Sequence, residues 1–547
     1  MVGCGEMKVL RQYFEKTRSM YLLLAGIVLL AHGSLLFSQR IGIDTELMME
    51  GYDRFTVLGR QGITWLGKVF YLWWFNLYWA EALTVLFMVL APIAYVFAFS
   101  CVGRQDRFLN ISLIVFGTAY ALSALWATQL YFLNQAAQVA CACFLVPVTA
   151  VLVEKARENL KKNWVALPAA IGLMQIVFAT YQTIILMYIV TVAMLFLLSS
   201  PEEKRSLKED LEWLCYHIAV FFVGFTAYMV IAKKYFMSEA DYLEGQIFWK
   251  TTDAQTCIQN ILACVKRNLG NNPPFYTGLY LVMCVILVGV SIDYFMNTGK
   301  KKHGNRIFMV LAELFVMASP FLLFVYAGGD AADRIQFIMP FAQACILYLT
   351  VYMLSGYERK DGKRTVGSVA RTLVLMILLI VVFRDGVIQA SYCNRLYYTD
   401  EWVFQHDRAM AQDLYGKIKT AISEVEEEER AAVRGVFVGN AQVSYNGSCF
   451  KTSIMGESRF AYSPGDLAKD RAVRLMKALG YPVDDIFYYY SEGAAAYTKE
   501  MLKTEMKSDI DAMPSYPADG CVKVLTLRDG QKYMVVKLSD YWWMWGE

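Results

Sequence analysis

Charged residues are scarce in this 547-residue chain. Only 18% of its residues are Asp, Glu, Lys or Arg, against about 25% in soluble proteins, and 57% are hydrophobic. The net charge of +3 is too small to favour nucleic-acid binding, which depends on neutralising many phosphates. This composition predicts a polytopic membrane protein.

Several motifs of soluble chemistry are also absent. The sequence has no P-loop, no GxSxG elbow and no dinucleotide fingerprint, so use of a cytoplasmic nucleotide is not indicated. Its 12 cysteines include no CxxC pair, which disfavours a zinc or redox centre. Cys393, Cys449 and Cys521 leave room for one disulfide in the tail, but we expect free thiols.

Long apolar runs recur through the first 390 residues. Each is about 18–23 residues long, enough to cross about 30 Å of hydrocarbon. We predict eleven membrane-spanning helices at 20–37, 77–100, 109–126, 131–153, 164–180, 182–199, 212–232, 276–296, 307–327, 336–355 and 368–389.

The distribution of Lys and Arg predicts how these helices are oriented. The loops on the N-terminal side of the membrane hold 21 Lys and Arg residues in roughly 71 positions. The opposite loops before residue 390 hold 10 in roughly 95. The positive-inside rule therefore places the N-terminus in the cytoplasm, and an odd number of spans places the C-terminal tail outside.

The predicted organisation has three parts: a cytoplasmic N-terminus (1–19), a transmembrane domain (20–389) and a soluble tail (390–547). Outer loop 38–76 is expected to form two interfacial helices, one from Thr45 and one over 63–77. A second long outer loop covers 233–275. In the tail, a helix at 400–424 and strands at 435–438 and 533–538 predict a small α/β or α+β domain. The fold class is thus an all-α membrane protein with an extracytoplasmic mixed domain.

Ionisable residues inside the spans are few. His32, Glu81, His217 and Glu313 stand out, and we expect Glu81 to reach water near the outer end of its span. These residues form no chain, and broken helices are not paired between two halves of the sequence. A coupled transporter is therefore disfavoured.

An acidic motif, Ile43-Asp44-Thr45-Glu46, follows the first span on the outer side. Its two carboxylates can act as a base, bind a divalent metal, or stabilise a helix N-terminus. Nucleotide sugars are absent outside the cell, so a lipid-linked substrate suits this side of the membrane. A polyprenyl phosphate needs cations for its phosphate, and arginine pairs two phosphate oxygens at once.

Five motifs together resemble the type II Gtr glucosyltransferases, which modify O-antigen, and through them the GT-C superfamily. They are Ile43-Asp44-Thr45-Glu46, Leu58-Gly59-Arg60-Gln61-Gly62, Thr180-Tyr181-Gln182-Thr183, Asp333-Arg334 and Asn394-Arg395-Leu396-Tyr397-Tyr398-Thr399-Asp400. The resemblance covers most of the membrane part and the start of the tail, and the second half of the tail adds nothing to it.

The resemblance implies an inverting membrane glycosyltransferase that moves a hexose such as glucose from a polyprenyl-phosphate donor to a cell-surface glycan. It implies a location in the bacterial plasma (inner) membrane and a general base at Asp44 or Glu46. The candidates for binding substrate and phosphate are Arg60, Gln61, Tyr181, Gln182, Lys233 and Arg334.

Several of these residues also have a structural interpretation, and Tyr181 and Gln182 can simply be the polar residues that a hairpin turn needs. Arg60 can extend to lipid headgroups, Arg334 can pair with Asp330 or Asp333, and Lys233 can anchor a helix end. His32 is expected to be a packed polar residue.

Two other functions remain open: a lipid-carrier flippase or transporter, and a non-enzymatic cell-envelope assembly protein. No cofactor is required by any motif, and a divalent metal at Asp44 and Glu46 is left open.

Overall fold

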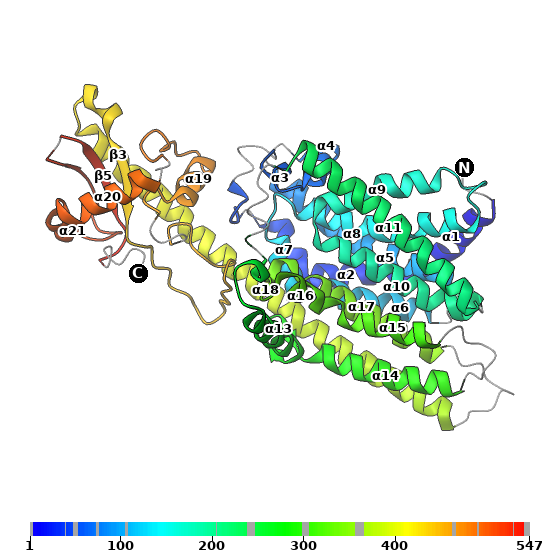
Figure 1. The fold of residues 1–547 in the computed structure, drawn as a ribbon. Coiled ribbons are helices and arrows are strands. Elements are labelled where there is room, and N and C mark those ends of the chain that lie inside the picture. Colours follow the sequence, from blue (N-terminus) through cyan, green and yellow to red (C-terminus); the bar gives the residue numbers. More distant parts are fainter. Residues whose placement is uncertain are drawn as a thin grey trace. The chain divides into compact units, whose positions relative to one another are not determined.

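We describe a computed structural model of the chain. It describes residues 4–38, 40–46, 53–72, 76–103, 108–203, 205–237, 245, 247–297, 306–355, 366–461, 466–488, 492–528 and 530–540. Most of these residues lie in helices (Figure 1).

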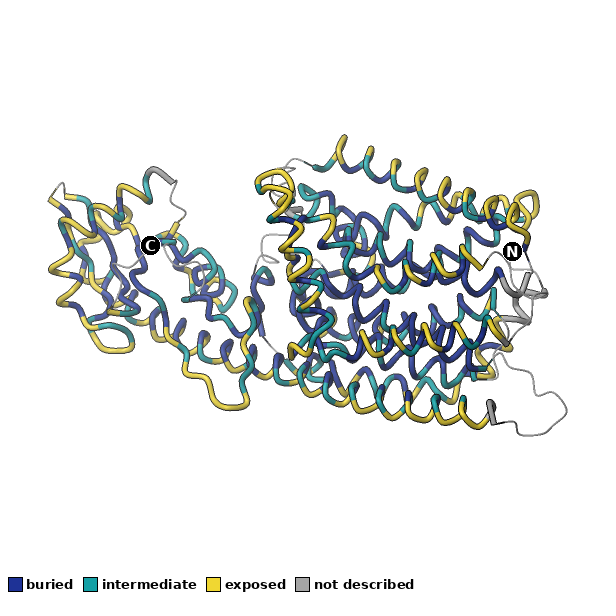
Figure 2. Tube along the Cα trace, turned by 60° about the horizontal axis from the view of Figure 1, so that its bottom comes forward, coloured by how far each residue is buried: buried dark blue, intermediate teal, exposed yellow. Residues whose placement is uncertain are grey.

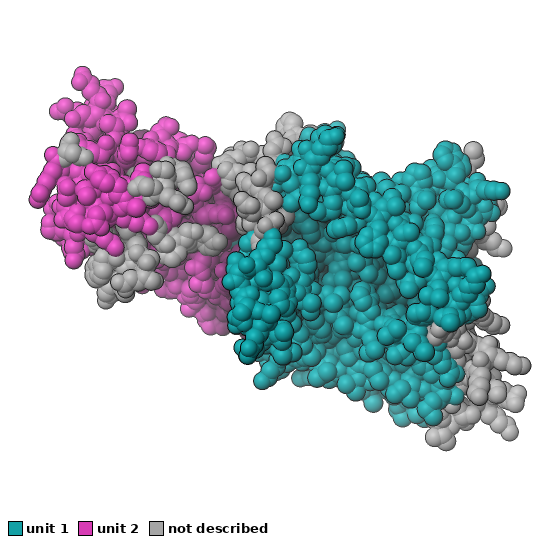
Figure 3. Space-filling model, viewed as in Figure 1, with its two compact units in different colours: residues 1–37, 51–394 teal, residues 38–50, 395–547 magenta. Residues whose placement is uncertain are grey.

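The chain divides into two compact units, which Figure 3 shows in different colours. The membrane unit comprises residues 1–37 and 51–394, and the C-terminal unit comprises residues 38–50 and 395–547. The segment that carries Asp44 and Glu46 therefore belongs to the C-terminal unit, although it lies in the loop after the first span.

Helices form nearly all of the membrane unit. They are α1 (Cys4–Thr17), α2 (Tyr21–His32), α3 (Asp53–Thr56), α4 (Gln61–Val69), α5 (Leu77–Val102), α6 (Leu109–Ala121), α7 (Ala124–Leu130), α8 (Ala136–Glu158), α9 (Ala166–Thr180), α10 (Thr183–Glu203), α11 (Leu207–Tyr235), α13 (Ala254–Leu269), α14 (Leu279–Asn297), α15 (Arg306–Ala318), α16 (Leu322–Ala327) and α17 (Ile338–Ser355). The 3₁₀ helices are η1 (Arg18–Met20), η2 (Gly33–Phe37), η4 (Phe248–Lys250), η5 (Ser319–Phe321) and η6 (Asp333–Ile335). Two short strands, β1 (Asn271–Asn272) and β2 (Tyr276–Thr277), pair antiparallel.

Nine helices among the described residues are long and apolar enough to cross a membrane. A tenth candidate is the pair α6 and α7, which is bent by 58° where Ser123 accepts a hydrogen bond from the backbone N–H of Leu125. The predicted span 109–126 is therefore wrong as one continuous helix. The predicted span 164–180 corresponds to α9, which is apolar but shorter than the others. The all-α polytopic membrane fold is confirmed.

Helix α17 is the most buried of the spans. In the span that it forms with η6, 94% of the most apolar 18-residue stretch is buried, which places α17 inside the bundle. Figure 2 shows that buried residues gather in the interior of the membrane unit. It packs against α6 and α14, while α5 packs against α8 and α6. Glu81 on α5 is fully buried, so the expectation that it reaches water is wrong. His32 packs its Nε2 2.7 Å from the carbonyl oxygen of Ala121, as expected for a structural polar residue.

The two helices predicted in outer loop 38–76 are only partly described. The first was expected from Thr45 to Leu58; its residues 47–52 lie outside the described residues, and α3 follows them. The second is α4, whose buried side packs against α9 and α8. It ends at Val69, well before the predicted end at residue 77.

The C-terminal unit is a mixed domain built on the last turns of the long helix α18 (Val366–Ser423). The other elements are η8 (Glu427–Ala432), β3 (Arg434–Val438), α19 (Asp470–Ala478), α20 (Glu492–Thr504), α21 (Lys507–Ala512), β4 (Val522–Thr526) and β5 (Lys532–Lys537). The sheet order is β3-β5-β4, with β3 parallel and β4 antiparallel to β5. Strands β3 and β5 were predicted, whereas β4 was not.

The three cysteines considered for a disulfide are free thiols. Cys393 and Cys521 are buried and Cys449 is partly exposed. The Cys393 thiol lies 3.5 Å from the carbonyl oxygen of Leu122 and acts as a packed donor.

One close approach in the C-terminal sheet generates a stability prediction. A Cβ added at Gly435 would lie 2.4 Å from the Phe487 ring, and the ring cannot withdraw freely because it packs on Phe437 at 4.6 Å. We expect Gly435→Ala to destabilise the C-terminal unit by about 1–3 kcal/mol. Gly416→Ala on α18 is the control, since no atom lies within 4 Å of its added Cβ. It should stabilise the unit by up to about 1 kcal/mol.

Both effects can be measured by heating the purified full chain in detergent and using limited proteolysis of the C-terminal unit as the signal of its unfolding. Equal melting temperatures for the two variants would contradict this packing.

Candidate functional site

The two motif carboxylates share one arginine within the C-terminal unit. One terminal nitrogen of Arg471 lies 2.6 Å from Asp44 Oδ1 and 2.8 Å from Glu46 Oε1. Asp44 is 33% exposed and Arg471 is 23% exposed. Glu46 is 1% exposed, so its carboxylate is taken almost completely out of water.

A tight turn presents these carboxylates. The backbone N–H of Thr45 donates to the carbonyl of Gly42 at 3.0 Å, and Asp44 takes a left-handed conformation with φ +67°. Asp tolerates this region better than most residues, but the conformation still costs energy. Local strain that the surrounding structure maintains is typical of functional positions.

Arg471 comes from α19, 425 positions after Glu46. Burial lowers the pKa of Arg471, but the charges of Asp44 and Glu46 outweigh burial and hold this pKa above its usual value. Nothing in the sequence analysis indicated this residue, because the second half of the tail matched no motif. Only the fold brings it to the acidic motif.

Two further arginines hold the same segment. Arg40 is 1% exposed, lies 3.3 Å from Asp400 and stacks over the Tyr397 ring at 4.6 Å. Arg459 donates to the carbonyl oxygen of Ile41 at 2.5 Å. Residues 40–46 are therefore built into the C-terminal unit at both sides of the turn.

The residues around Asp44 and Glu46 do not fit a divalent metal site. A guanidinium occupies hydrogen-bonding positions on both carboxylates, and its positive charge would repel a second cation. Across the described ranges, no group of three His, Cys, Asp or Glu side chains is arranged for a metal.

In the membrane unit, the structure brings Arg60 together with Tyr181 and Gln182. The Arg60 Nε donates to Gln182 Oε1 at 3.2 Å, and its guanidinium lies 4.5 Å from the Tyr181 ring centroid. Gln182 in turn donates to the carbonyl of Leu58 at 3.3 Å. Two of the motifs quoted in the resemblance are thus neighbours in space, across 122 positions.

Gly62 makes this contact possible. A Cβ at this position would lie 2.6 Å from the backbone nitrogen of Thr180, so only glycine lets the start of α4 approach the turn between α9 and α10. Gln61 is consequently buried beside that turn, and its side-chain oxygen has no hydrogen-bond partner among the described residues.

Arg334 belongs to the same region through aromatic contacts. Its guanidinium lies 5.2 Å from the Phe132 ring, and η6, which carries it, packs against α7. Phe337, three residues later, stacks on Trp126 at 4.9 Å and contacts Tyr181 at 5.9 Å. A continuous aromatic layer therefore extends from Tyr181 to the helix turn that presents Arg334.

Asp330 pairs with Arg267 and not with Arg334. Two hydrogen bonds of 2.7 Å join the Arg267 guanidinium to both Asp330 oxygens. Partial burial opposes ionisation of Asp330, but these bonds outweigh it, so the pKa of Asp330 lies below its usual value. The suggestion that Arg334 pairs with Asp330 is therefore wrong.

Lys233 is not brought to this cluster. It is exposed near the end of α11, whereas Tyr228 on the buried face of α11 donates to the carbonyl of Gly59 at 3.2 Å. Five residues along a helix turn the side chain to another face.

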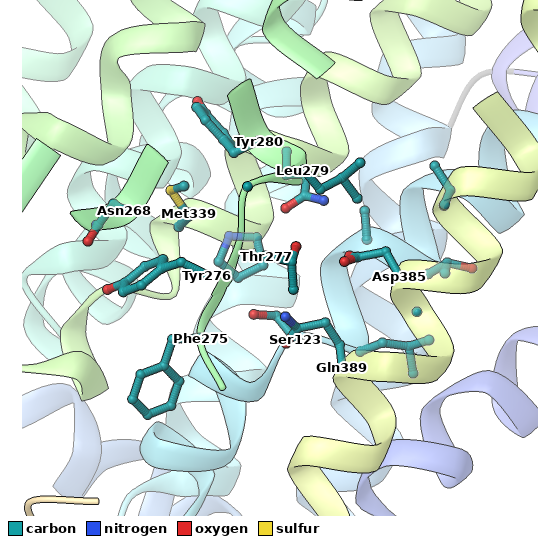
Figure 4. A pocket seen from close by; sticks show the side chains of 18 residues that line it. Ser123, Asn268, Phe275, Tyr276, Thr277, Leu279, Tyr280, Met339, Asp385 and Gln389 are labelled. Atoms are coloured by element: carbon teal, nitrogen blue, oxygen red, sulfur yellow. The ribbon is translucent and has the colours of Figure 1, made fainter. Parts of the chain in front are cut away.

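A small polar cavity of about 30 Å³ lies at the bend between α6 and α7 (Figure 4). Ser123, Thr277, Asp385 and Gln389 are among its lining residues, and Gln389 accepts a hydrogen bond from the backbone N–H of Ala124 at 2.8 Å. Its volume suits a water or one hydroxyl group. Asp385 lies inside the predicted span 368–389, and an acidic residue in an apolar run is a signal that the sequence analysis passed over.

Comparison with known proteins gives one family. The family described as glucosyl transferase GtrII matches residues 33–354, more than half of the chain. No curated protein and no solved structure matches the chain. The matched range includes Asp44, Glu46, Arg60, Tyr181, Gln182 and Arg334, and it ends before α18.

The shared ion pair gives a second stability prediction. Arg471→Met leaves Glu46 buried without a counter-charge, and we expect a loss of about 2–3 kcal/mol. This is below the range for a fully buried pair because Asp44 and Arg471 are partly solvated. A second substitution, Glu46→Gln, should recover much of the loss.

Arg474→Met is the matched control on the same helix. Arg474 pairs with Asp470 at 2.9 Å with both side chains partly exposed, so its loss should cost less than about 1 kcal/mol. Thermal melting of the four variants in detergent checks the set. Additive effects of Arg471→Met and Glu46→Gln would show that the two residues are not coupled.

Proposed function

The chain belongs to the glucosyl transferase GtrII family, and from this premise we propose that it transfers a hexosyl group from a polyprenyl-phosphate donor to an extracytoplasmic glycan. The protein is a multi-pass membrane glycosyltransferase. A lipid-linked donor fits an enzyme whose sequence has no nucleotide-binding motif. It also fits the positions of Arg60 and Arg334, the candidate phosphate-binding residues, in the membrane unit.

The proposed topology follows the charge distribution. The N-terminus (1–19) is cytoplasmic, residues 20–389 form a GT-C-like transmembrane domain, and residues 390–547 form a domain outside the plasma membrane of a bacterium. The excess of Lys and Arg in the loops on the N-terminal side supports this orientation.

Asp44 is the proposed general base. One third of its side chain is exposed, so an acceptor hydroxyl can approach it, and the ion pair with Arg471 fixes its position. Glu46 is buried and contacts the same nitrogen, which suits a positioning role. This difference in exposure is the observation that carries the assignment.

The proposed reaction is one in-line displacement. The acceptor oxygen attacks C1 of the hexose, the bond from C1 to the phosphate oxygen breaks, and the phosphate leaves with the electron pair. The acceptor proton passes to Asp44. A single displacement inverts the configuration at C1.

Arg60 and Arg334 are the proposed phosphate-binding residues of the membrane unit. Charge develops on the departing phosphate, and a guanidinium stabilises that charge through two parallel hydrogen bonds. Tyr181 and Gln182 orient Arg60 through the stacking and hydrogen-bonding contacts described above. Gln61 is a further substrate-binding candidate. Lys233 stays a candidate for the lipid phosphate on grounds of charge alone.

The assignment of Asp44 as the base predicts that neutralising Asp44 and neutralising a second carboxylate have different effects on transfer activity. Asp44→Asn should lower transfer by about 10²–10⁴-fold, since the variant cannot accept a proton. Asp470→Asn is the control: it neutralises another carboxylate of the C-terminal unit, and this variant should retain transfer activity. Transfer of labelled hexose from a synthetic polyprenyl-phosphate donor in proteoliposomes measures both. Full activity of a folded Asp44→Asn enzyme would refute Asp44 as the base.

The phosphate assignment predicts an effect on donor use. Arg60→Gln should lower kcat/KM for the donor by about tenfold to a hundredfold, because a charge-assisted hydrogen bond is lost. Arg371→Gln is the control in the same unit, where Arg371 pairs with Asp293 at 3.1 Å. The same assay over a range of donor concentrations separates kcat from KM. An unchanged kcat/KM in Arg60→Gln would remove this residue from donor binding.

A further inference from the structure

We infer that a group of buried amides in the membrane unit binds the hydroxyl groups of the donor sugar. The group, called the amide cluster below, consists of Gln61, Gln129, Gln135 and Gln138. The inference rests on the proposed function, since it assumes a hexose linked to a phosphate. It adds a sugar-binding site to the phosphate-binding arginines.

The amide cluster is buried but not satisfied. The exposed fractions are 1% for Gln61, 0% for Gln129, 4% for Gln135 and 0% for Gln138. Within the described ranges, both amide atoms of Gln129 and the side-chain oxygens of the other three have no hydrogen-bond partner. Each such group costs about 1–3 kcal/mol. Polar side chains inside a membrane protein are expensive and are typical of functional positions.

The members of the amide cluster lie on adjoining elements. Gln129, Gln135 and Gln138 follow one another along the end of α7 and the start of α8. Gln61 begins α4, and α4 lies over α8, because a Cβ added at Gly67 would be 3.6 Å from Gln138 Nε2. The neighbouring hydroxyl of Tyr181 and indole N–H of Trp126 also have no partner among the described residues.

The surroundings of the amide cluster match the two halves of a glycosyl phosphate. Arg60 stacks on Tyr181, and Arg334 stacks on Phe132, which lies in the chain between Gln129 and Gln135. The guanidinium groups suit a phosphate. The amides are uncharged, and their unpaired atoms are four acceptor oxygens and the Nε2 donor of Gln129, which suits neighbouring sugar hydroxyls.

A purely structural role would leave the amides paired. Gln175 on α9 illustrates that case, since its Nε2 donates to the carbonyl oxygens of Gly224 at 3.1 Å and Ile171 at 3.3 Å. Gln129 makes no comparable bond within the described chain. Because the amide cluster is closed to solvent, a sugar ring reaches it only if a covering element such as α4 shifts.

The test replaces one amide by an apolar side chain of similar size. Gln129→Leu removes two unpaired polar atoms from the interior, so we expect a higher melting temperature than wild type. The same variant should bind a hexosyl-phospho-polyprenol in nanodiscs about tenfold more weakly or worse. Its affinity for polyprenyl phosphate without a sugar should stay within about twofold of wild type, because the arginines are intact.

Gln175→Leu is the matched control. It breaks two existing hydrogen bonds, so it should lower the melting temperature and leave both lipid affinities unchanged. Gln138→Leu repeats the lipid-binding test at a second position, in case Gln129→Leu does not fold. Because Gln138 Nε2 donates to the carbonyl of Asn134 at 3.3 Å, the rise in melting temperature is expected for Gln129→Leu alone.

Two results would overturn the inference, and a third would refute the proposed function on which it rests. Folded Gln129→Leu and Gln138→Leu variants that bind the glycosylated lipid as wild type does would show that the amides do not contact the sugar. Equal loss of both lipids would indicate a structural role. If wild-type protein binds neither lipid, the proposed function itself is refuted. This outcome is distinguishable because it is measured on the wild type alone.

Discussion

Buried charge in the C-terminal unit is the constraint on which the position of the acidic motif depends. Asp400 and Glu46 are almost completely removed from water, and an unpaired charge there would cost several kcal/mol. Arginines from distant parts of the chain compensate them: Arg40 pairs with Asp400, and Arg471 pairs with Glu46 and Asp44. The loop after the first span is therefore folded as part of a domain whose other residues begin more than 340 positions later. The location of Asp44 is a property of that domain and not of its own short loop.

This dependence explains what sequence patterns could predict. Membrane spans follow from apolar runs that need no partner, so each predicted span overlaps one helix or bent pair. Strands β3 and β5 were visible as short β-branched runs, whereas β4, which is short and has a lysine among its apolar residues, was not recognised. The helix break at Ser123 could not be predicted from the sequence, because a single serine in an apolar run caps a helix only where the tertiary structure bends the chain. The partners Arg471 of Glu46 and Arg267 of Asp330 are long-range contacts, and no local pattern indicates them.

The exposure of the two motif carboxylates supports the different roles proposed for them. A base must meet its substrate and then return its proton, so it needs access; a carboxylate that fixes an arginine needs only a constant geometry. The Asp44 side chain is accessible to a substrate, and its backbone adopts a left-handed conformation that costs energy. Glu46 has the burial. Both contact one nitrogen of Arg471, so a change in either carboxylate alters the position of the other through the guanidinium.

The membrane unit shows a complementary division between charged and neutral groups. Arg60 and Arg334 are partly exposed and lie against aromatic rings, an arrangement that lowers the cost of holding a cation near hydrocarbon without neutralising it. The amide cluster is enclosed and uncharged; Gln138 Nε2 donates to the carbonyl of Asn134 at 3.3 Å, but the four side-chain oxygens have no hydrogen-bond partner among the described residues. A protein gains no stability by keeping Gln129 where leucine would pack, since the unpaired amide costs free energy in every folded molecule. A feature that costs stability in the folded state needs a compensating function, and a ligand with several hydroxyl groups supplies the hydrogen bonds that the fold leaves unmade.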